Sequence, residues 1–431
     1  MKNDTSSALS RNTLTPAALA VRAPESPSAA HPVLYDTQAA CLVFCCGIVF
    51  KVSSLPGLVS DKMHSGTLWL YLFMIAVDLA CFAAVACFAS RGSADVLSRA
   101  DSLSFRVFSA LVAAWLELKG FVYFAYTVVF LMVDLFAVVP PFVVVVILAL
   151  PVLYLGTKGL RGIARCAELF TPVLFLILLG SLAFLETDLD VGRNLPLAAM
   201  PTDEFFARGL RFGMWTGDFL PLLFVRLERK RKFPVLPVGA GVSYALVAVI
   251  ALLAVAMYGE ALPYVYNILI RLSAFNRLSL EIGRLEWAAI FVVIVMATLS
   301  LSLHMWGASE GCRRAFGTPV PARVLFAAAV IVIPIALPSL HEVIDFSTGT
   351  FGYIAFAFTV AVSAAALLLA RKAKRAAKED SPISPEEEDR DTPVSVPPEL
   401  PEESGASAPT LPVPEHGEKR RAGEDKGGGD A

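Results

Sequence analysis

The stretch CCGIVFKVSSLPG (Cys45–Gly57) lies inside an apolar run that is long enough to cross a membrane. It interrupts that run with a lysine, two serines and a proline. A charge at the depth of the hydrocarbon is costly, and a proline there frees backbone groups that lipid cannot satisfy. The stretch therefore indicates either a segment that does not span the membrane or a break in a spanning helix that the function requires.

The composition favours the second reading. Of the 431 residues, 56% are hydrophobic and only 17% are charged, which is typical of a polytopic membrane protein. Ten apolar segments are each long enough for a transmembrane helix of about 20 residues. They are residues 39–59, 66–90, 104–134, 139–156, 160–185, 205–225, 233–258, 285–309, 322–338 and 346–370. The amphipathic stretch Leu262–Leu278 predicts a further helix at the membrane surface.

The charges of the connecting loops predict the orientation. Basic clusters such as RLERKRK (Arg226–Lys232) alternate with acidic or neutral loops such as ETDLD (Glu186–Asp190). Basic loops stay on the cytosolic side, so we expect both termini in the cytosol. We predict a membrane domain at residues 35–371, with disordered cytosolic tails at residues 1–34 and 372–431. The C-terminal tail is rich in proline and acidic residues and has no aromatic residue, so it cannot bury a core.

A second interruption resembles the first. It is RGLRFGMWTGDFLP (Arg208–Pro221) in segment six, and segments one and six are the first of each half if ten spans divide into five plus five. Interrupted segments at matching positions of two halves indicate a transporter binding site, where half-helix ends offer free N–H and C=O groups to a carboxylate and an ammonium. The alternative is a proline kink with a snorkelling lysine. The predicted ligand-binding residues are Lys51, Ser53, Ser54, Gly213, Gly217 and Asp218.

Charges inside the spans should pair, because an isolated one is expensive in hydrocarbon. Lys51 and Asp218 lie at similar depths, so we predict an ion pair between them, with Glu117 as a competing partner. Glu117 and Lys119 are two residues apart and point to different faces of their helix; of the two, Glu117 is expected to face the interior. Asp78 and Glu117 are the predicted members of a proton or ion path.

Sequence signals of catalysis are missing. The chain has no GxxxxGK[ST] phosphate loop and no GxSxG elbow, and its five histidines have no metal-ligand spacing. The seven cysteines read as small buried hydrophobes in reduced form. We therefore expect a binding or transport protein rather than an enzyme, with no cofactor, no metal and no nucleic-acid partner.

Four stretches carry a resemblance to a known family. They are SSLPGLV (Ser53–Val59), GLRGIARCAELFTPVLFLILL (Gly159–Leu179), TGDFLPLLFVRLERKRK (Thr216–Lys232) and GRLEWAAIFVVIVMATLSLSLHMWGASEGCRRAFG (Gly283–Gly317). In this order the chain resembles the spore germination permeases, the B subunits of nutrient germinant receptors, in the amino acid–polyamine–organocation superfamily. The resemblance implies an all-α, LeuT-like fold of ten transmembrane helices in a five-plus-five inverted repeat, with helices one and six discontinuous.

The resemblance also implies a function. The ligand would be a small amino acid or similar nutrient bound at the two breaks, and the partners would be an A-type and a C-type receptor subunit. The location would be the bacterial cell membrane or the spore inner membrane, in contact with lipid. Where the family commonly has Gly-x-Gly before the Leu-Pro, this chain has Val49-Phe50-Lys51. The alternatives are a proton-coupled amino acid permease and an assembly subunit whose site is blocked.

Overall fold

The computed structural model describes residues 33–379, apart from 54, 64–65, 91–102, 135–137, 184, 186–191, 193–200, 229–233, 266, 275–285 and 337–339. The first tail up to residue 32, the acidic loop Glu186–Asp190 and most of the C-terminal tail therefore lie outside the described residues. The last helix continues to Glu379, past the predicted end of the membrane domain at residue 371.

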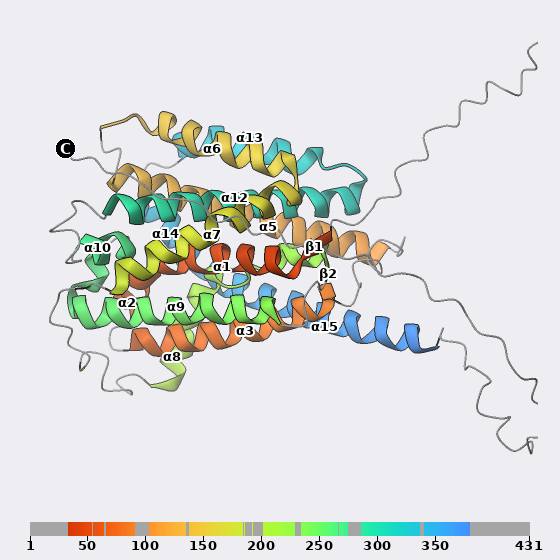
Figure 1. Ribbon diagram of the computed structural model, residues 1–431, viewed down its shortest axis with the longest axis horizontal. Coiled ribbons are helices and arrows are strands. Elements are labelled where there is room, and N and C mark those ends of the chain that lie inside the picture. Colours follow the sequence, from red (N-terminus) through yellow and green to blue (C-terminus); the bar gives the residue numbers. More distant parts are fainter. Residues whose placement is uncertain are drawn as a thin grey trace, which may run out of the picture. The chain divides into compact units, whose positions relative to one another are not determined.

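Helices dominate the described part of the chain (Figure 1). The first half consists of β1 (Val33–Tyr35), α1 (Asp36–Ser53), α2 (Leu55–Met63), α3 (Thr67–Ser90), α5 (Leu103–Asp134), α6 (Pro141–Lys158) and α7 (Leu160–Ala183). The second half begins with three short pieces, α8 (Thr202–Gly209) and the 3₁₀ helices η4 (Leu210–Trp215) and η5 (Leu220–Phe224). It continues with β2 (Arg226–Glu228), α9 (Val235–Tyr258), η6 (Gly259–Tyr264), α10 (Ile268–Ala274), α12 (Glu286–Phe316), α13 (Val320–Ala336), α14 (Leu340–Thr348) and α15 (Thr350–Glu379).

Eight of the described helices are long and apolar enough to cross a membrane. Two predicted spans are not among them. Segment 205–225 is divided among α8, η4 and η5, and α13 has 17 residues. The chain is thus a multi-pass, all-α membrane protein with a broken sixth segment. The division into five-plus-five repeats stays a prediction.

Helix α1 is the centre of the bundle. Nearly all its side chains are buried, because α7, α9 and α12 pack around it. Figure 1 shows α1 running between α7 and α9. A helix enclosed in this way is apolar on all sides, which explains why α1 has almost no amphipathic character. Any polar residue of α1 therefore needs a partner from a neighbouring helix.

Two short strands tie the first and sixth segments together. Strand β1 precedes α1, β2 follows η5, and they pair in parallel with Leu34 opposite Leu227. The start of α1 and the end of the sixth segment are thus held at the same end of the bundle. The stretch 262–278, predicted as a surface helix, is described as the end of η6 and helix α10. In α10, Ile268, Leu269 and Leu272 are buried, because α10 packs against α1 and α12. Its location at the membrane surface stays a prediction.

Candidate functional site at the breaks of segments one and six

The break in the first segment lies where the opening sequence predicts it. Helix α1 ends at Ser53 and α2 begins at Leu55, with Pro56 as its second residue. A helix end leaves its last carbonyl groups without intrahelical partners. One of these is satisfied from α3, because the Tyr71 hydroxyl donates to the Lys51 carbonyl oxygen at 3.0 Å.

The break in the sixth segment requires a glycine. Between η4 and η5 the backbone at Gly217 has a φ of +79°, in the left-handed region that glycine favours. A Cβ atom at this position would also lie 2.7 Å from Cγ2 of Thr359 on α15. Residue 217 therefore adopts a conformation that favours glycine at a place where no side chain fits.

Four buried charges meet between the two breaks, and we call them the ion cluster: Lys51 on α1, Asp78 on α3, Lys119 on α5 and Asp218 after Gly217. Lys51 Nζ pairs with Asp218 Oδ2, and it lies 3.2 Å from Asp78 Oδ2. Lys119 Nζ lies 2.7 Å from Asp218 Oδ1. None of the four residues is more than 3% exposed. The two cations and two carboxylates compensate each other at close range, which makes their burial tolerable.

The ion cluster also satisfies backbone groups that the broken sixth segment leaves free. Asp78 Oδ1 accepts a hydrogen bond from the Gly217 N–H at 2.7 Å, and Lys119 Nζ donates to the Thr216 carbonyl oxygen. An unpaired backbone group inside a membrane costs roughly several kcal/mol, so the groups that the break frees need new partners. These contacts replace the lost helical hydrogen bonds. The cluster is therefore part of what makes the break possible.

Two tyrosines complete the cluster. The Tyr244 hydroxyl of α9 donates to Asp78 Oδ2 at 2.5 Å, and the Tyr123 hydroxyl of α5 donates to Asp218 Oδ1 at 2.8 Å. Both rings also lie near an ammonium: Lys51 Nζ is 5.6 Å from the Tyr244 centroid, and Lys119 Nζ is 5.2 Å from that of Tyr123. Hydroxyl groups and aromatic faces together surround charges that would otherwise face hydrocarbon.

The sequence-based pairing is confirmed in part. Lys51 pairs with Asp218 as predicted. The prediction that Glu117 is the competing partner of Lys51 is wrong, because the second carboxylate beside Lys51 is that of Asp78. From α5 it is Lys119, and not Glu117, that reaches the ion cluster. Glu117 is buried, and its Oε2 has no hydrogen-bond partner among the described residues. The spacing of Lys119 and Tyr123, four residues apart on one helix face, is a signal that could have identified this side of α5.

The other predicted ligand-binding residues lie in different surroundings. Gly213 packs against α15, where a Cβ atom would lie 2.5 Å from the Gly352 carbonyl oxygen, so its missing side chain allows close helix packing. Ser53 lines a separate cavity described below. Ser54 lies outside the described residues. The ligand roles of these residues, and the proton path through Asp78 and Glu117, stay predictions.

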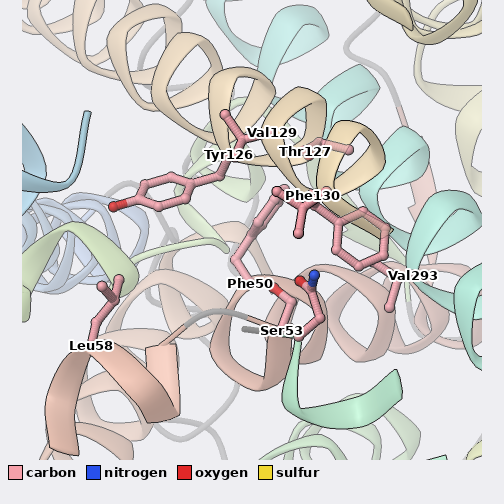
Figure 2. Close-up of a pocket in the computed structure, with 10 residues that line it drawn as sticks. Phe50, Ser53, Leu58, Tyr126, Thr127, Val129, Phe130 and Val293 are labelled. Carbon is pink, nitrogen blue, oxygen red and sulfur yellow. The ribbon is translucent and has the colours of Figure 1, made fainter. Parts of the chain in front are cut away.

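A small cavity of about 20 Å³ lies beside the break of the first segment, and we call it the Phe50 pocket. Figure 2 shows side chains converging on it from α1, α2, α5 and α12, among them Phe50, Ser53, Leu58, Thr127, Phe130 and Val293. The Phe50 ring stacks on Tyr123 with centroids 3.8 Å apart. Phe50 thus contacts both the pocket and the ring whose hydroxyl binds Asp218.

The Phe50 pocket is mostly apolar. Of the described residues that line it, none carries a charge at neutral pH. Its polar groups include Ser53, Asn267 and Thr127, whose hydroxyl donates to the Tyr123 carbonyl oxygen at 2.8 Å. Asn267 has a φ of +56°, in the left-handed region that asparagine tolerates better than most residues. In this conformation the pocket has room for about one water molecule.

Comparison with known proteins places the chain among membrane proteins of one family. The structure is similar to that of Mhp1, a nucleobase-cation-symport-1 family transporter solved in a closed conformation with bromovinylhydantoin bound. The identity is 12%, the match covers 81% of this chain and 94% of that one, and the TM-score is 0.47. A search of curated proteins finds no match. The family model described as "Spore germination protein" matches residues 103–342, more than half of the chain. The chain therefore belongs to the spore germination protein family.

Proposed function

We propose that this chain is the B-type subunit of a spore nutrient germinant receptor, which senses a small nutrient rather than carrying it across the membrane. The observation that carries the proposal is the ion cluster, whose charges come from α1, α3, α5 and the break of segment six. It lies next to the small, mostly apolar Phe50 pocket. Membership of the spore germination protein family supports the biological setting.

The ion cluster favours sensing over transport for a physical reason. A carrier of this general design alternates its access by moving groups of helices against each other around a central site. Here the centre is occupied by contacts that join four parts of the bundle, and separating them would strand charges in a medium of low dielectric constant. The four charges also compensate each other, so the cluster offers no unpaired carboxylate to a coupling proton.

The route for a signal is short. A ligand in the Phe50 pocket would contact Phe50, which stacks on Tyr123, whose hydroxyl binds Asp218 at the break of segment six. A shift of Phe50 would therefore bias the position of the sixth segment, which a partner subunit could detect. We place the protein in the spore inner membrane with both termini in the cytosol, in a complex with A-type and C-type subunits.

Two measurements test the proposal. Spores of the host that lack the gene should lose germination with one class of nutrient, and should still germinate with a cationic surfactant that needs no receptor. Purified protein in liposomes should bind the active nutrient without accumulating it, with and without a proton gradient. Accumulation driven by the proton gradient would show that the protein is a permease rather than a receptor. A full nutrient response of the mutant spores would contradict the receptor role.

The second candidate function is a proton-coupled amino acid permease. The observation that favours it is Glu117, a buried carboxyl group in the transmembrane part of α5 whose Oε2 has no partner among the described residues. An intramembrane carboxyl group of this kind is a candidate proton carrier. If the permease is correct, liposome uptake should depend on the proton gradient, and Glu117→Gln should abolish that dependence.

A further inference from the structure

A cavity of about 490 Å³ lies at the end of the bundle where β1 and β2 pair, and we call it the α3–α9 cavity. Helices α3 and α9 run side by side (Figure 1) and form most of its walls. The first residue of α1 and Leu227 of β2 complete the described lining. Small-molecule sites have volumes of about 300–1,000 Å³, so this cavity has room for a ligand.

The walls of the α3–α9 cavity are mostly apolar. Leu79 and Phe82 line it from α3, and Leu236 and Ala240 line it from α9. The lining of α3 extends from Leu79 to Ser90, the last residue of the helix, which is roughly 16 Å at about 1.5 Å per residue. A long apolar cavity of this kind suits a hydrocarbon chain, because polar groups without hydrogen-bond partners are unfavourable there.

The α3–α9 cavity opens on the outer side of both helices. Ala83 lines the cavity and is exposed, and it lies on the same face of α3 as the exposed Leu72. On α9, the exposed Pro237 lines the cavity beside Val238, which shares an exposed face with Val249. In a chain that spans the membrane, exposed apolar faces of this kind contact lipid. A lipid molecule can therefore enter the cavity from the bilayer.

Asp36 supplies the one charge in the described lining of the cavity. The residue is only 6% exposed, and its carboxylate has no hydrogen bond or ion pair within the part of the chain that the structure describes. A buried charge without a partner is destabilising, whereas a charge with a hydrogen-bonded partner is tolerated. The carboxylate therefore calls for a cationic group on whatever fills the cavity.

The position of Asp36 fits the head group of a membrane lipid. Asp36 is the first residue of α1, and it lines the cavity together with Ser90 at the end of α3 and Pro234 just before α9. Membrane-spanning helices end near the level of the polar head groups. The carboxylate thus lies near that level, and the apolar walls lead from it toward Leu79, deeper in the hydrocarbon.

We infer that the α3–α9 cavity binds a phospholipid whose head group carries a primary ammonium, with the ammonium on Asp36 and an acyl chain along α3 and α9. A primary ammonium donates charge-assisted hydrogen bonds to a carboxylate, whereas a quaternary ammonium has no N–H to donate. The site is separate from the proposed nutrient site, since its described lining shares no residue with the Phe50 pocket. A lipid there would lie against the strand pair that joins the first and sixth segments.

Three probes that differ in one feature at a time test the inference. The full-length protein is purified in detergent and freed of lipid, and binding is measured by native mass spectrometry. We expect dioleoyl-phosphatidylethanolamine to bind at least about tenfold more tightly than dioleoyl-phosphatidylcholine, which corresponds to about 1.4 kcal/mol. Equal or tighter binding of the choline lipid overturns the inference.

The third probe is glycerophosphoethanolamine, the same head group without acyl chains. It should bind at least about tenfold more weakly than the ethanolamine lipid, because it cannot fill the apolar walls. If it binds as tightly as the lipid, the cavity takes a soluble amine and the assignment to a membrane lipid is overturned.

A charge variant locates the head group. Asp36→Asn keeps the shape of the side chain and removes its charge, so the two dioleoyl lipids should bind within about twofold of each other. Asp203→Asn, at an exposed carboxylate in α8, is the control and should keep the preference for ethanolamine. A preference of about tenfold that survives in Asp36→Asn overturns the inference, because another group would then read the ammonium.

A pair of size variants locates the acyl chain. Ala83 and Ala76 are both exposed on one face of α3, and of the two only Ala83 lines the cavity. Ala83→Trp should weaken binding of the ethanolamine lipid at least about tenfold, and Ala76→Trp should leave it within about twofold. Both sites are exposed, so both variants should fold, as size-exclusion chromatography would verify. Equal affinities of these two variants overturn the placement of the lipid in the α3–α9 cavity.

Discussion

The ion cluster and the Phe50 pocket are neighbours with opposite chemistry. The cluster holds four charges and two tyrosine hydroxyls that all have partners, whereas the lining of the pocket carries no charge among the described residues. The stacked pair Phe50 and Tyr123 joins them. The difference shows that charged side chains are concentrated where the backbone is broken: they satisfy the freed backbone groups, and the adjoining space remains apolar.

Removing Asp218 should have the largest effect on the ion cluster, because it removes the carboxylate that both lysines contact. Asp218→Ala should lower the free energy of unfolding by about 3–5 kcal/mol, the cost of stranding buried charges. Unfolding in mixed detergent micelles measures this change. Asp203→Ala in α8, at an exposed site, is the control and should change the stability little. A variant at position 218 that is as stable as the control would show that the cluster does not hold the breaks.

Lys51→Met should have a smaller effect. Without Lys51, Asp218 keeps Lys119, and Asp78 keeps the Gly217 N–H and the Tyr244 hydroxyl. We expect a loss of about 1.5–3 kcal/mol, the range for hydrogen bonds to charged groups. The same unfolding titration should rank this variant between wild type and Asp218→Ala. A loss larger than that of Asp218→Ala would mean that Lys51, and not Asp218, is the centre of the cluster.

Gly217→Ala tests the backbone at the break rather than its charges. The left-handed φ and the nearby Thr359 side chain should make the substitution cost about 1–3 kcal/mol. Gly241→Ala is the matched control: it lies in helix α9, where an added Cβ atom would meet nothing within 4 Å. It should be neutral or stabilising by about 0.5–1 kcal/mol, because alanine favours helices. Equal melting temperatures for both variants would contradict the strain at position 217.

Thr127→Val should have the smallest effect on stability, and it tests whether the lining of the pocket matters for function. The Thr127 hydroxyl donates only within its own helix, to the Tyr123 carbonyl oxygen, and valine has nearly the same shape. The expected loss is below about 1 kcal/mol. Because Thr127 lines the pocket, the nutrient response of spores should change while the melting temperature does not. A large drop in melting temperature would assign Thr127 to the framework instead.

Local sequence predicted much of this arrangement. The helices follow from apolar runs, and the interruptions near Pro56 and Gly217 marked both breaks. Their similar depths in two interrupted segments whose breaks are expected to face each other predict the pairing of Lys51 with Asp218, because a charge in hydrocarbon needs an opposite charge nearby. The separate resemblance to the spore germination permeases agrees with the family match. These features depend on composition and on residue patterns that can be found along the chain without knowing which helix faces meet.

Other features depended on which helix faces meet. Spacing along α5 separates Glu117 from Lys119 but does not say which of them faces the centre, and packing against the sixth segment selects Lys119. Asp78 lies in α3 and Tyr244 in α9, far apart in the chain, and only tertiary structure brings the Tyr244 hydroxyl to the Asp78 carboxylate. The Phe50 pocket likewise exists only where four helices leave space. Where the backbone breaks follows from local sequence, because proline, glycine and polar residues act on their own segment. Which groups satisfy the break follows from the packing of distant helices, because hydrogen bonds and ion pairs require atoms within about 3 Å.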